Sequence, residues 1–129
     1  MGYHTGTDFE TFPSEKASDV VVSAVCEGTV IFAGWVKGYG GVLIQSCLLS
    51  GNPVTVLYGH MNASSLLTKG TALYAGQHIG SLGKGFSSET DGERKHLHLG
   101  VHRGSLIDFR GYVSASSALS QWINAYPLR

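Results

Sequence analysis

The chain has 129 residues, of which 43% are hydrophobic and 14% are charged. This length suits one domain with a real hydrophobic core, and the low charge excludes a highly charged disordered chain. Basic and acidic side chains balance to a formal net charge of +0. No overall field therefore favours nucleic acid or an anionic membrane surface, and we expect no nucleic-acid partner.

Targeting and membrane signals are absent from the sequence as it stands. No apolar run approaches the ~18 residues needed to cross a bilayer, so we expect no transmembrane segment. The N-terminal residues 1–4 lack the basic start and apolar stretch of a secretory signal peptide. Cys26 and Cys47 match no cysteine metal motif, and we interpret them as half-buried strand thiols, with a structural disulfide as the alternative.

Glycine-rich turns and β-branched segments predict a mainly β fold. Residues 1–12 are polar and residues 13–19 are typical of a loop. The turn signal at residues 37–41 predicts a hairpin, and residues 63–69 could hold one helical turn. The predicted strands are Val20–Val25, Gly28–Trp35, Val42–Cys47 and Val54–Tyr58, with short pieces in Leu73–Ile79 and at Leu82.

The final predicted strand, His96–His102, follows the polar stretch Phe86–Lys95, which we expect to be an exposed loop. Strict alternation places Leu97, Leu99 and Val101 on one face of this strand and His96, His98 and His102 on the other.

The spacing of apolar residues changes near the C-terminus, where they recur at intervals of three and four. They predict one short amphipathic C-terminal helix that Ser116 or Ser117 can cap and that Pro127 ends. The apolar residues are Leu119, Trp122, Ile123 and Tyr126.

Two pairs of side chains are candidates for a metal or catalytic site. His4 and Asp8 offer the nitrogen and oxygen donors that zinc accepts, although such a pair also occurs by chance on surfaces. His96 and His98 project from one strand face about 6.6 Å apart. Both could bind a metal, one could bind while the other moves protons, or both could lie exposed on a solvated face.

Three further histidines lie outside these two pairs. His60 follows a predicted strand after Gly59, where catalytic side chains are often presented. His102 lies about 13 Å beyond His98 along the strand, so we predict a rim or surface position. His78 lies in a short strand between turns.

Taken together and in this order, the motifs resemble the lysostaphin/LytM family of zinc metallopeptidases, peptidase family M23. The motifs are Gly2-Tyr3-His4-Thr5-Gly6-Thr7-Asp8-Phe9, Gly28-Thr29-Val30 through Gly38-Tyr39-Gly40, Tyr58-Gly59-His60-Met61, Ala75-Gly76-Gln77-His78-Ile79-Gly80 and His96-Leu97-His98. The resemblance implies a compact antiparallel β-sheet domain of the M23 peptidase type, with its active site in a groove walled by loops. We expect residues 1–129 to form this single domain.

The resemblance also implies the site. His4, Asp8 and His98 would bind one Zn²⁺ per chain and leave a fourth position for water. His96 would be the general base, and His60 its companion histidine, helping to stabilise the developing oxyanion. Zinc suits hydrolysis because it is a Lewis acid that lowers the pKa of bound water toward 7 without redox change.

The implied activity is zinc-dependent hydrolysis of peptide bonds in bacterial peptidoglycan cross-links or stem peptides. Such an enzyme works outside the cytoplasm, in the periplasm, at the cell wall or secreted, so we expect export to depend on sequence outside this chain. In the family the stretch before His-x-His is usually shorter; here it ends in Arg94-Lys95, which we expect to bear on substrate preference.

Two alternatives belong to other functional classes. One is a non-catalytic M23-like binding or regulatory domain, although degenerate relatives usually lack a ligand and this chain retains all three. The other is a mononuclear iron oxygenase, since two histidines and one carboxylate also describe the facial triad. Its usual His-x-Asp/Glu spacing is absent, and metal analysis distinguishes it from a zinc enzyme.

Overall fold

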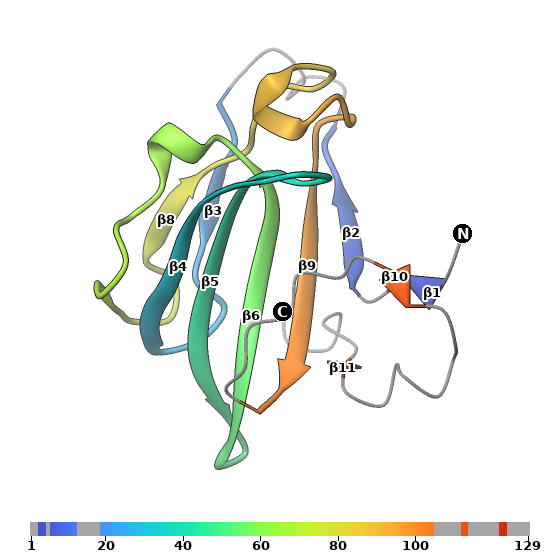
Figure 1. Cartoon of the computed structure of the whole chain (residues 1–129). Helices are drawn as coiled ribbons and strands as arrows, with labels where there is room; N and C mark the ends of the chain where they lie inside the picture. Colours follow the sequence, from blue (N-terminus) through green and yellow to red (C-terminus); the bar gives the residue numbers. More distant parts are fainter. Residues whose placement is uncertain (1–2, 5, 13–18, 105–111, 114–121, 124–129) are drawn as a thin grey trace.

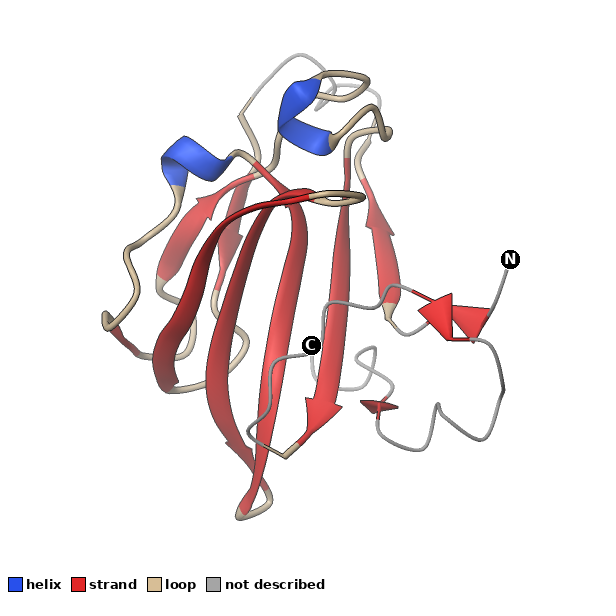
Figure 2. Ribbon diagram, viewed as in Figure 1, coloured by secondary structure: helices blue, strands red, loops and turns tan. Residues whose placement is uncertain are grey.

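The computed structural model describes residues 3–4, 6–12, 19–104, 112–113 and 122–123, with side chains for 6–12 and 19–104. Within these ranges the regular elements are strands and two short 3₁₀ helices (Figure 2). The strands are β1 (Tyr3–His4), β2 (Thr7–Glu10), β3 (Val21–Ser23), β4 (Gly28–Val36), β5 (Gly40–Leu49), β6 (Asn52–Met61), β7 (Ala72–Leu73), β8 (His78–Ser81), β9 (His96–Arg103), β10 (Tyr112–Val113) and β11 (Trp122–Ile123). The 3₁₀ helices are η2 (Ala63–Ser65) and η3 (Ser88–Thr90).

A seven-stranded antiparallel sheet forms the main layer (Figure 1). Its order is β11, β9, β6, β5, β4 and β7, and β2 also pairs with β9. The β5–β6 hairpin turns at Ser50 and Gly51, whose φ values of 51° and 81° suit a two-residue turn that follows the strand twist. β1 pairs separately with β10.

A small second sheet, β3 paired with β8, packs against one face of the main sheet and lies behind it in Figure 1. Val22 and Ile79 from the small sheet join Leu43, Tyr58 and Leu99 from the main sheet in one buried cluster. Apolar residues on both layers therefore face a shared core, which holds the main sheet on this side.

The opposite face of the main sheet carries a second buried cluster. It contains Tyr39, Val42, Ile44 and Leu57. Figure 2 shows both 3₁₀ helices at the same end of the molecule, which is also where the β4–β5 turn lies and where β9 begins. The candidate site forms at this end.

The predicted strands agree closely with the structure. The segments predicted at Gly28–Trp35, Val42–Cys47, Val54–Tyr58 and His96–His102 are confirmed as β4, β5, β6 and β9, each extended by one or more residues. The strand predicted over Val20–Val25 is shorter, as β3. The single helical turn predicted in residues 63–69 is confirmed as η2.

The prediction that Phe86–Lys95 is an exposed loop is confirmed for Phe86 and residues 91–94, which are exposed, and is wrong in two respects. The segment contains η3, and both Thr90 and Lys95 are buried. The Thr90 hydroxyl lies 2.7 Å from the carbonyl oxygen of Glu93 and 3.1 Å from that of Lys84. This local hydrogen bonding explains how a polar sequence forms a compact, partly buried structure.

The prediction of a C-terminal helix is wrong at Trp122 and Ile123, which form strand β11 opposite His102 and Val101 of β9. Pairing with an open strand edge outweighs a short helical repeat, because such a repeat is a weak signal. The rest of that prediction lies outside the described residues.

Cys26 and Cys47 form a disulfide, with Cα atoms 6.1 Å apart, so the interpretation as two thiols is wrong as well. Sequence separation alone could not show that the β3–β4 connection returns beside β5. Within the described residues, no helix has the length and apolar character needed to span a membrane.

Candidate functional site

The pairing of β2 with β9 places a carboxylate beside the two histidines of the His-x-His motif. Asp8 lies directly opposite His98 in the register, and Gly59 of β6 lies opposite His98 on the other side. Asp8 Oδ1 is 3.3 Å from His98 Nδ1 and 3.7 Å from His96 Nε2. Opposed residues of antiparallel strands share a face, so the register itself assembles this group.

Two glycines allow the strands to approach this closely. A Cβ at Gly6 would lie 2.5 Å from the carbonyl oxygen of Leu99 and 2.8 Å from His98 Nε2. A Cβ at Gly59 would lie 2.7 Å from Cδ1 of Tyr39. Any side chain at either position would displace the neighbouring strand or ring, so the glycines of both motifs have a packing role.

His60 lies at the end of β6 and completes a cluster of rings. Its ring centroid is 4.3 Å from that of His96 and 6.4 Å from that of His98. Tyr39, from the β4–β5 turn, packs 5.7 Å from His60 and 5.1 Å from His98. Burial, followed by the neighbouring His96 and His98, lowers the pKa of His60 to about 4.

Backbone carbonyls fix the tautomers of His60 and His96. The Nδ1–H of His60 donates to the carbonyl oxygen of Tyr39 at 3.0 Å, and the Nδ1–H of His96 donates to that of Arg94 at 2.8 Å. Because a carbonyl can only accept, each neutral ring carries its proton on Nδ1 and presents an unprotonated Nε2. His96 Nε2 faces Asp8 and is placed to accept a proton.

Arg94 and Glu10 extend the site beyond the predicted residues. Arg94 Nε and Nη2 donate to the two oxygens of Glu10 at 2.9 and 2.6 Å, and Nη2 lies 3.4 Å from Asp8 Oδ2. The hydrogen bond from Arg94 lowers the pKa of Glu10, and the same contact raises the pKa of Arg94. Both side chains are about half exposed.

The donor set at Asp8 and His98 suits a zinc ion. A carboxylate oxygen and an imidazole nitrogen are common zinc ligands, and here they face each other across two strands. The backbone of His4 lies in β1, whereas its side chain is outside the described residues. The part of the chain with described side chains holds no group of three or more His, Cys, Asp or Glu arranged for a metal. The structure therefore brings together two of the three predicted ligands.

His102 is not the rim or surface residue that the sequence predicts. Its side chain is buried, with 9% exposed, because Thr55 of β6 and Trp122 of β11 flank it on both sides. Strand alternation places His102 on the histidine face but carries no information about its neighbours.

The sequence places Tyr39 in a family motif and Arg94 just before His-x-His, but it does not predict that these residues or Glu10 contact the candidate metal ligands and catalytic histidines. Glu10 and Asp8 alternate on one strand, and that spacing is a signal that they share a face. No local pattern links Arg94 to β2.

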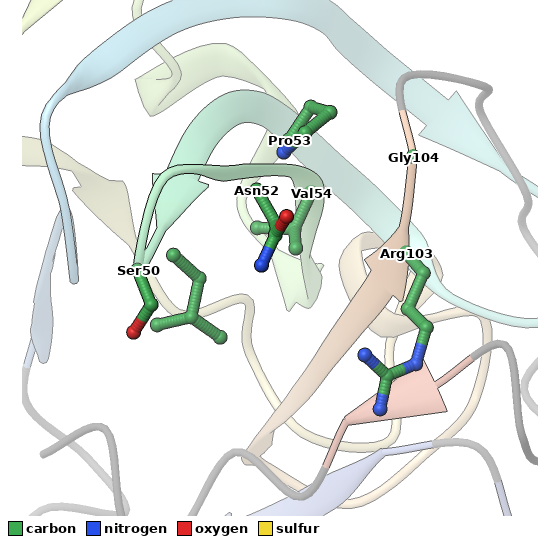
Figure 3. Close-up of a pocket in the computed structure, with 7 residues that line it drawn as sticks. Ser50, Asn52, Pro53, Val54, Arg103 and Gly104 are labelled. Atoms are coloured by element: carbon green, nitrogen blue, oxygen red, sulfur yellow. The ribbon is translucent and has the colours of Figure 1, made fainter.

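A separate cavity of about 660 Å³ lies beside the β5–β6 turn (Figure 3). Ser50, Asn52, Pro53 and Arg103 are among the residues that line it. This cavity is at the opposite end of β9 from His96. The predicted site residues with described side chains do not line it.

The fold and the motif order define a known class. The sequence model described as peptidase family M23 matches residues 2–109, so the chain belongs to peptidase family M23. This match confirms the family resemblance and, with it, a mainly antiparallel β fold of the M23 type.

Several solved structures share this fold. The catalytic domain of the antimicrobial peptidase lysostaphin from Staphylococcus simulans has a TM-score of 0.65 at 23% identity, over 98% of this chain and 87% of that one. LytU has a TM-score of 0.66 at 18% identity, over 96% and 70%.

A putative glycyl-glycine endopeptidase LytM from Ruminococcus gnavus has a TM-score of 0.54 at 24% identity, over 84% of this chain and 39% of that one. At these identities the similarity shows a shared fold. No curated protein sequence matches the chain.

Proposed function

We propose that the chain is a zinc-dependent endopeptidase that hydrolyses peptide bonds in bacterial peptidoglycan cross-links or stem peptides. His4, Asp8 and His98 would hold one Zn²⁺ per chain, and residues 1–129 would form a single catalytic domain. The observation that carries the proposal is the approach of Asp8 Oδ1 to within 3.3 Å of His98 Nδ1, beside two histidines with Nε2 unprotonated. Membership of a peptidase family supports it.

When bound, the zinc ion would supply Lewis acidity and activate water for attack on a peptide carbonyl. His96 has the geometry of the general base, because the Arg94 carbonyl orients its ring and leaves Nε2 as the proton acceptor. The proton taken up by His96 would then be returned to the leaving amine.

His60 is held as a neutral ring at neutral pH by its lowered pKa of about 4. With Nδ1–H engaged by the Tyr39 carbonyl, its Nε2 is a hydrogen-bond acceptor. Stabilising an oxyanion would require a donor at Nε2. We therefore assign His60 the role of orienting the water or the substrate amine beside His96.

Two similar structures support the proposed substrate, and the disulfide supports the proposed location. Lysostaphin is described as an antimicrobial peptidase, and the Ruminococcus gnavus protein as a putative glycyl-glycine endopeptidase. We propose peptidoglycan peptides as the substrate of this chain. The Cys26–Cys47 disulfide is of the kind that persists in oxidising compartments, which supports a location in the periplasm, at the cell wall or outside the cell.

Metal content and product analysis test the proposal. Purified protein should contain one zinc per chain and release peptides, identified by mass spectrometry, from peptidoglycans with different cross-bridges. His98→Ala should lose zinc and activity together. His96→Ala should keep zinc and lose about 10²-fold or more of the turnover, the usual scale for lost proton transfer.

Two results would contradict the proposal. Full zinc occupancy in His98→Ala would remove this residue from the ligand set. Zinc-loaded protein that releases no peptide from any preparation, with His96→Ala behaving identically, would favour the non-catalytic binding or regulatory domain.

A further inference from the structure

One guanidinium contacts both acidic side chains of β2. Arg94 Nη2 lies 2.6 Å from Glu10 Oε2 and 3.4 Å from Asp8 Oδ2, while Nε lies 2.9 Å from Glu10 Oε1. Asp8 and Glu10 are two residues apart on one strand, so their side chains share a face. The two-point contact with Glu10 fixes the plane of the guanidinium, as a single contact would not.

The two oxygens of Asp8 consequently face different partners. Oδ2 faces Arg94, whereas Oδ1 faces His98 Nδ1 at 3.3 Å and His96 Nε2 at 3.7 Å. Rotation about the terminal torsion of an aspartate is broad, so an unrestrained carboxylate would present either oxygen or both. The contact with Arg94 restricts that rotation and leaves one oxygen directed at the two histidines.

The main chain of Arg94 acts on the same group of residues. Its carbonyl oxygen accepts the Nδ1–H of His96 at 2.8 Å, which orients that ring. The preceding residue is itself anchored, because the carbonyl of Glu93 accepts hydrogen bonds from the buried Thr90 hydroxyl at 2.7 Å and from the Phe86 amide at 2.7 Å. Arg94 therefore projects from a fixed point of the loop.

We propose that Arg94, held by Glu10, is a positioning residue that presents Asp8 to the metal through a single oxygen. This inference rests on the proposed function, since it requires Asp8 to be a zinc ligand. Contacts of this kind behind a metal ligand typically change metal affinity about 10–100-fold.

A positioning role and a purely electrostatic role for Arg94 predict opposite changes in zinc affinity when Arg94 is replaced. If Arg94 acted only through its positive charge, removing it would strengthen cation binding at Asp8. If it positions Asp8, removing it weakens binding, and lysine does not restore binding because it lacks the fork that engages Glu10. Arg94→Lys and Arg94→Met separate the two effects, and Glu10→Gln loosens the fork while keeping Arg94.

The experiment measures zinc affinity of the full chain by competition with a chromophoric chelator, and the absorption bands of the Co²⁺-substituted protein. We expect about 10-fold weaker zinc binding in Arg94→Lys and Arg94→Met, with shifted cobalt bands, and a smaller effect in the same direction for Glu10→Gln. Lys69→Met is the control. Lys69 is exposed in the loop before β7, and β7 lies at the edge of the sheet farthest from β9.

The outcomes separate the two proposals. Unchanged or tighter zinc binding with unchanged cobalt bands in both Arg94 variants would overturn the positioning role and leave the zinc peptidase proposal standing. Wild-type protein that binds no zinc would overturn both. Circular dichroism confirms that each variant is folded. Losing the Glu10 charge would by itself weaken cation binding, so the Arg94 variants decide between the two effects and Glu10→Gln only has to agree with them.

Discussion

His60 is constrained in both its backbone and its ring. Its φ of 64° is in the left-handed region, which costs a residue with a side chain about 1–3 kcal/mol unless its surroundings enforce it. The Gly83 amide donates to the His60 carbonyl at 2.9 Å, and the ring donates to Tyr39. This strained, buried position turns the ring toward His96 at the point where β6 ends.

The acid stability of the protein should depend on His60. Burial and its histidine neighbours lower its pKa from 6.5 to about 4 on folding. Between these two pH values the unfolded chain binds a proton that the folded chain excludes, so the free energy of unfolding falls as the pH drops through this window. Well above pH 6.5 neither state binds the proton, and His60 makes no pH-dependent contribution.

Urea unfolding of wild type and His60→Gln at pH 7.5, 6 and 5 checks this effect. Glutamine does not titrate, so the stability of the variant should decline less steeply toward acid. Loss of a metal at low pH would affect both proteins and cancels in the comparison. Equal slopes for the two proteins would show that His60 titrates normally in the folded state.

At this scale the sequence predicts which residues form the candidate site better than it predicts their surroundings. Alternation along His96–His98 places both histidines on one face, and the β2–β9 register then brings Asp8 beside them. The contacts of Arg94 were not predictable, because an arginine in a polar loop has the same local pattern whether it is solvated or paired across the fold. His102 was misjudged for a related reason, since burial depends on neighbouring strands.

The segment 83–95 and the β4–β5 turn form one supporting structure for the site. The Trp35 indole N–H donates to the Ser88 carbonyl at 2.7 Å, and the Gly38 amide donates to Asp91 Oδ2 at 2.7 Å. A Cβ at Gly40 would lie 1.9 Å from the Glu89 carbonyl oxygen, so the two segments approach as closely as backbone allows. The turn carries Tyr39, and the segment leads into His96.

Asp91→Ala should loosen this contact. Asp91 has a φ of 51° at the end of η3, a conformation that aspartate tolerates better than alanine, and its carboxylate is the acceptor for Gly38. Losing the hydrogen bond to Gly38 and placing an alanine in the left-handed region should together lower the free energy of unfolding by about 1–2 kcal/mol. Amide hydrogen exchange at Gly38 should become faster.

Asp91→Asn is the matched control, because asparagine keeps an oxygen acceptor and also tolerates a left-handed φ. Its effect should be clearly smaller than that of alanine. If Gly38 exchanged at the wild-type rate in Asp91→Ala, the hydrogen bond would not be holding the turn against the segment.

Strands with clear local sequence signals could be predicted, whereas elements that form by pairing with a strand distant in the sequence could not. The strands β4, β5, β6 and β9 each combine β-branched residues with strong turn signals at their ends. Trp122 and Ile123 lie on a helical repeat, yet they pair with β9 beyond the stretch that β2 occupies. The competition between a short helix and an open strand edge is decided by tertiary structure.

At the scale of the whole molecule, the disulfide adds a covalent link to the packing between the main sheet and the small sheet. Cys26 lies between β3 and β4, and Cys47 lies near the end of β5 that is remote from Tyr39. The bond therefore ties the connection from the small sheet to the main sheet. Val25, Val54, Val56 and Val101 lie around it and line a small cavity.

Removing this bond should destabilise the fold and leave the site unchanged. The bond closes a loop with a sequence separation of 21 residues, for which restriction of the unfolded chain contributes about 3 kcal/mol. The double variant Cys26→Ala/Cys47→Ala should lose a free energy of unfolding of this size, measured by urea unfolding. Its zinc affinity should match wild type, because the disulfide and His98 lie toward opposite ends of the sheet.

Reduction gives an independent version of the same measurement. Dithiothreitol should lower the stability of wild type to near that of the double variant and should not affect the double variant, which has no thiol. If reduced and oxidised wild type unfolded at the same urea concentration, the bond would contribute nothing to stability. Since restriction of the unfolded chain acts through the closed loop, a loss of zinc affinity in the double variant, measured without dithiothreitol because that dithiol itself binds zinc, would instead mean that the two layers transmit strain along β5 and β6 to the site.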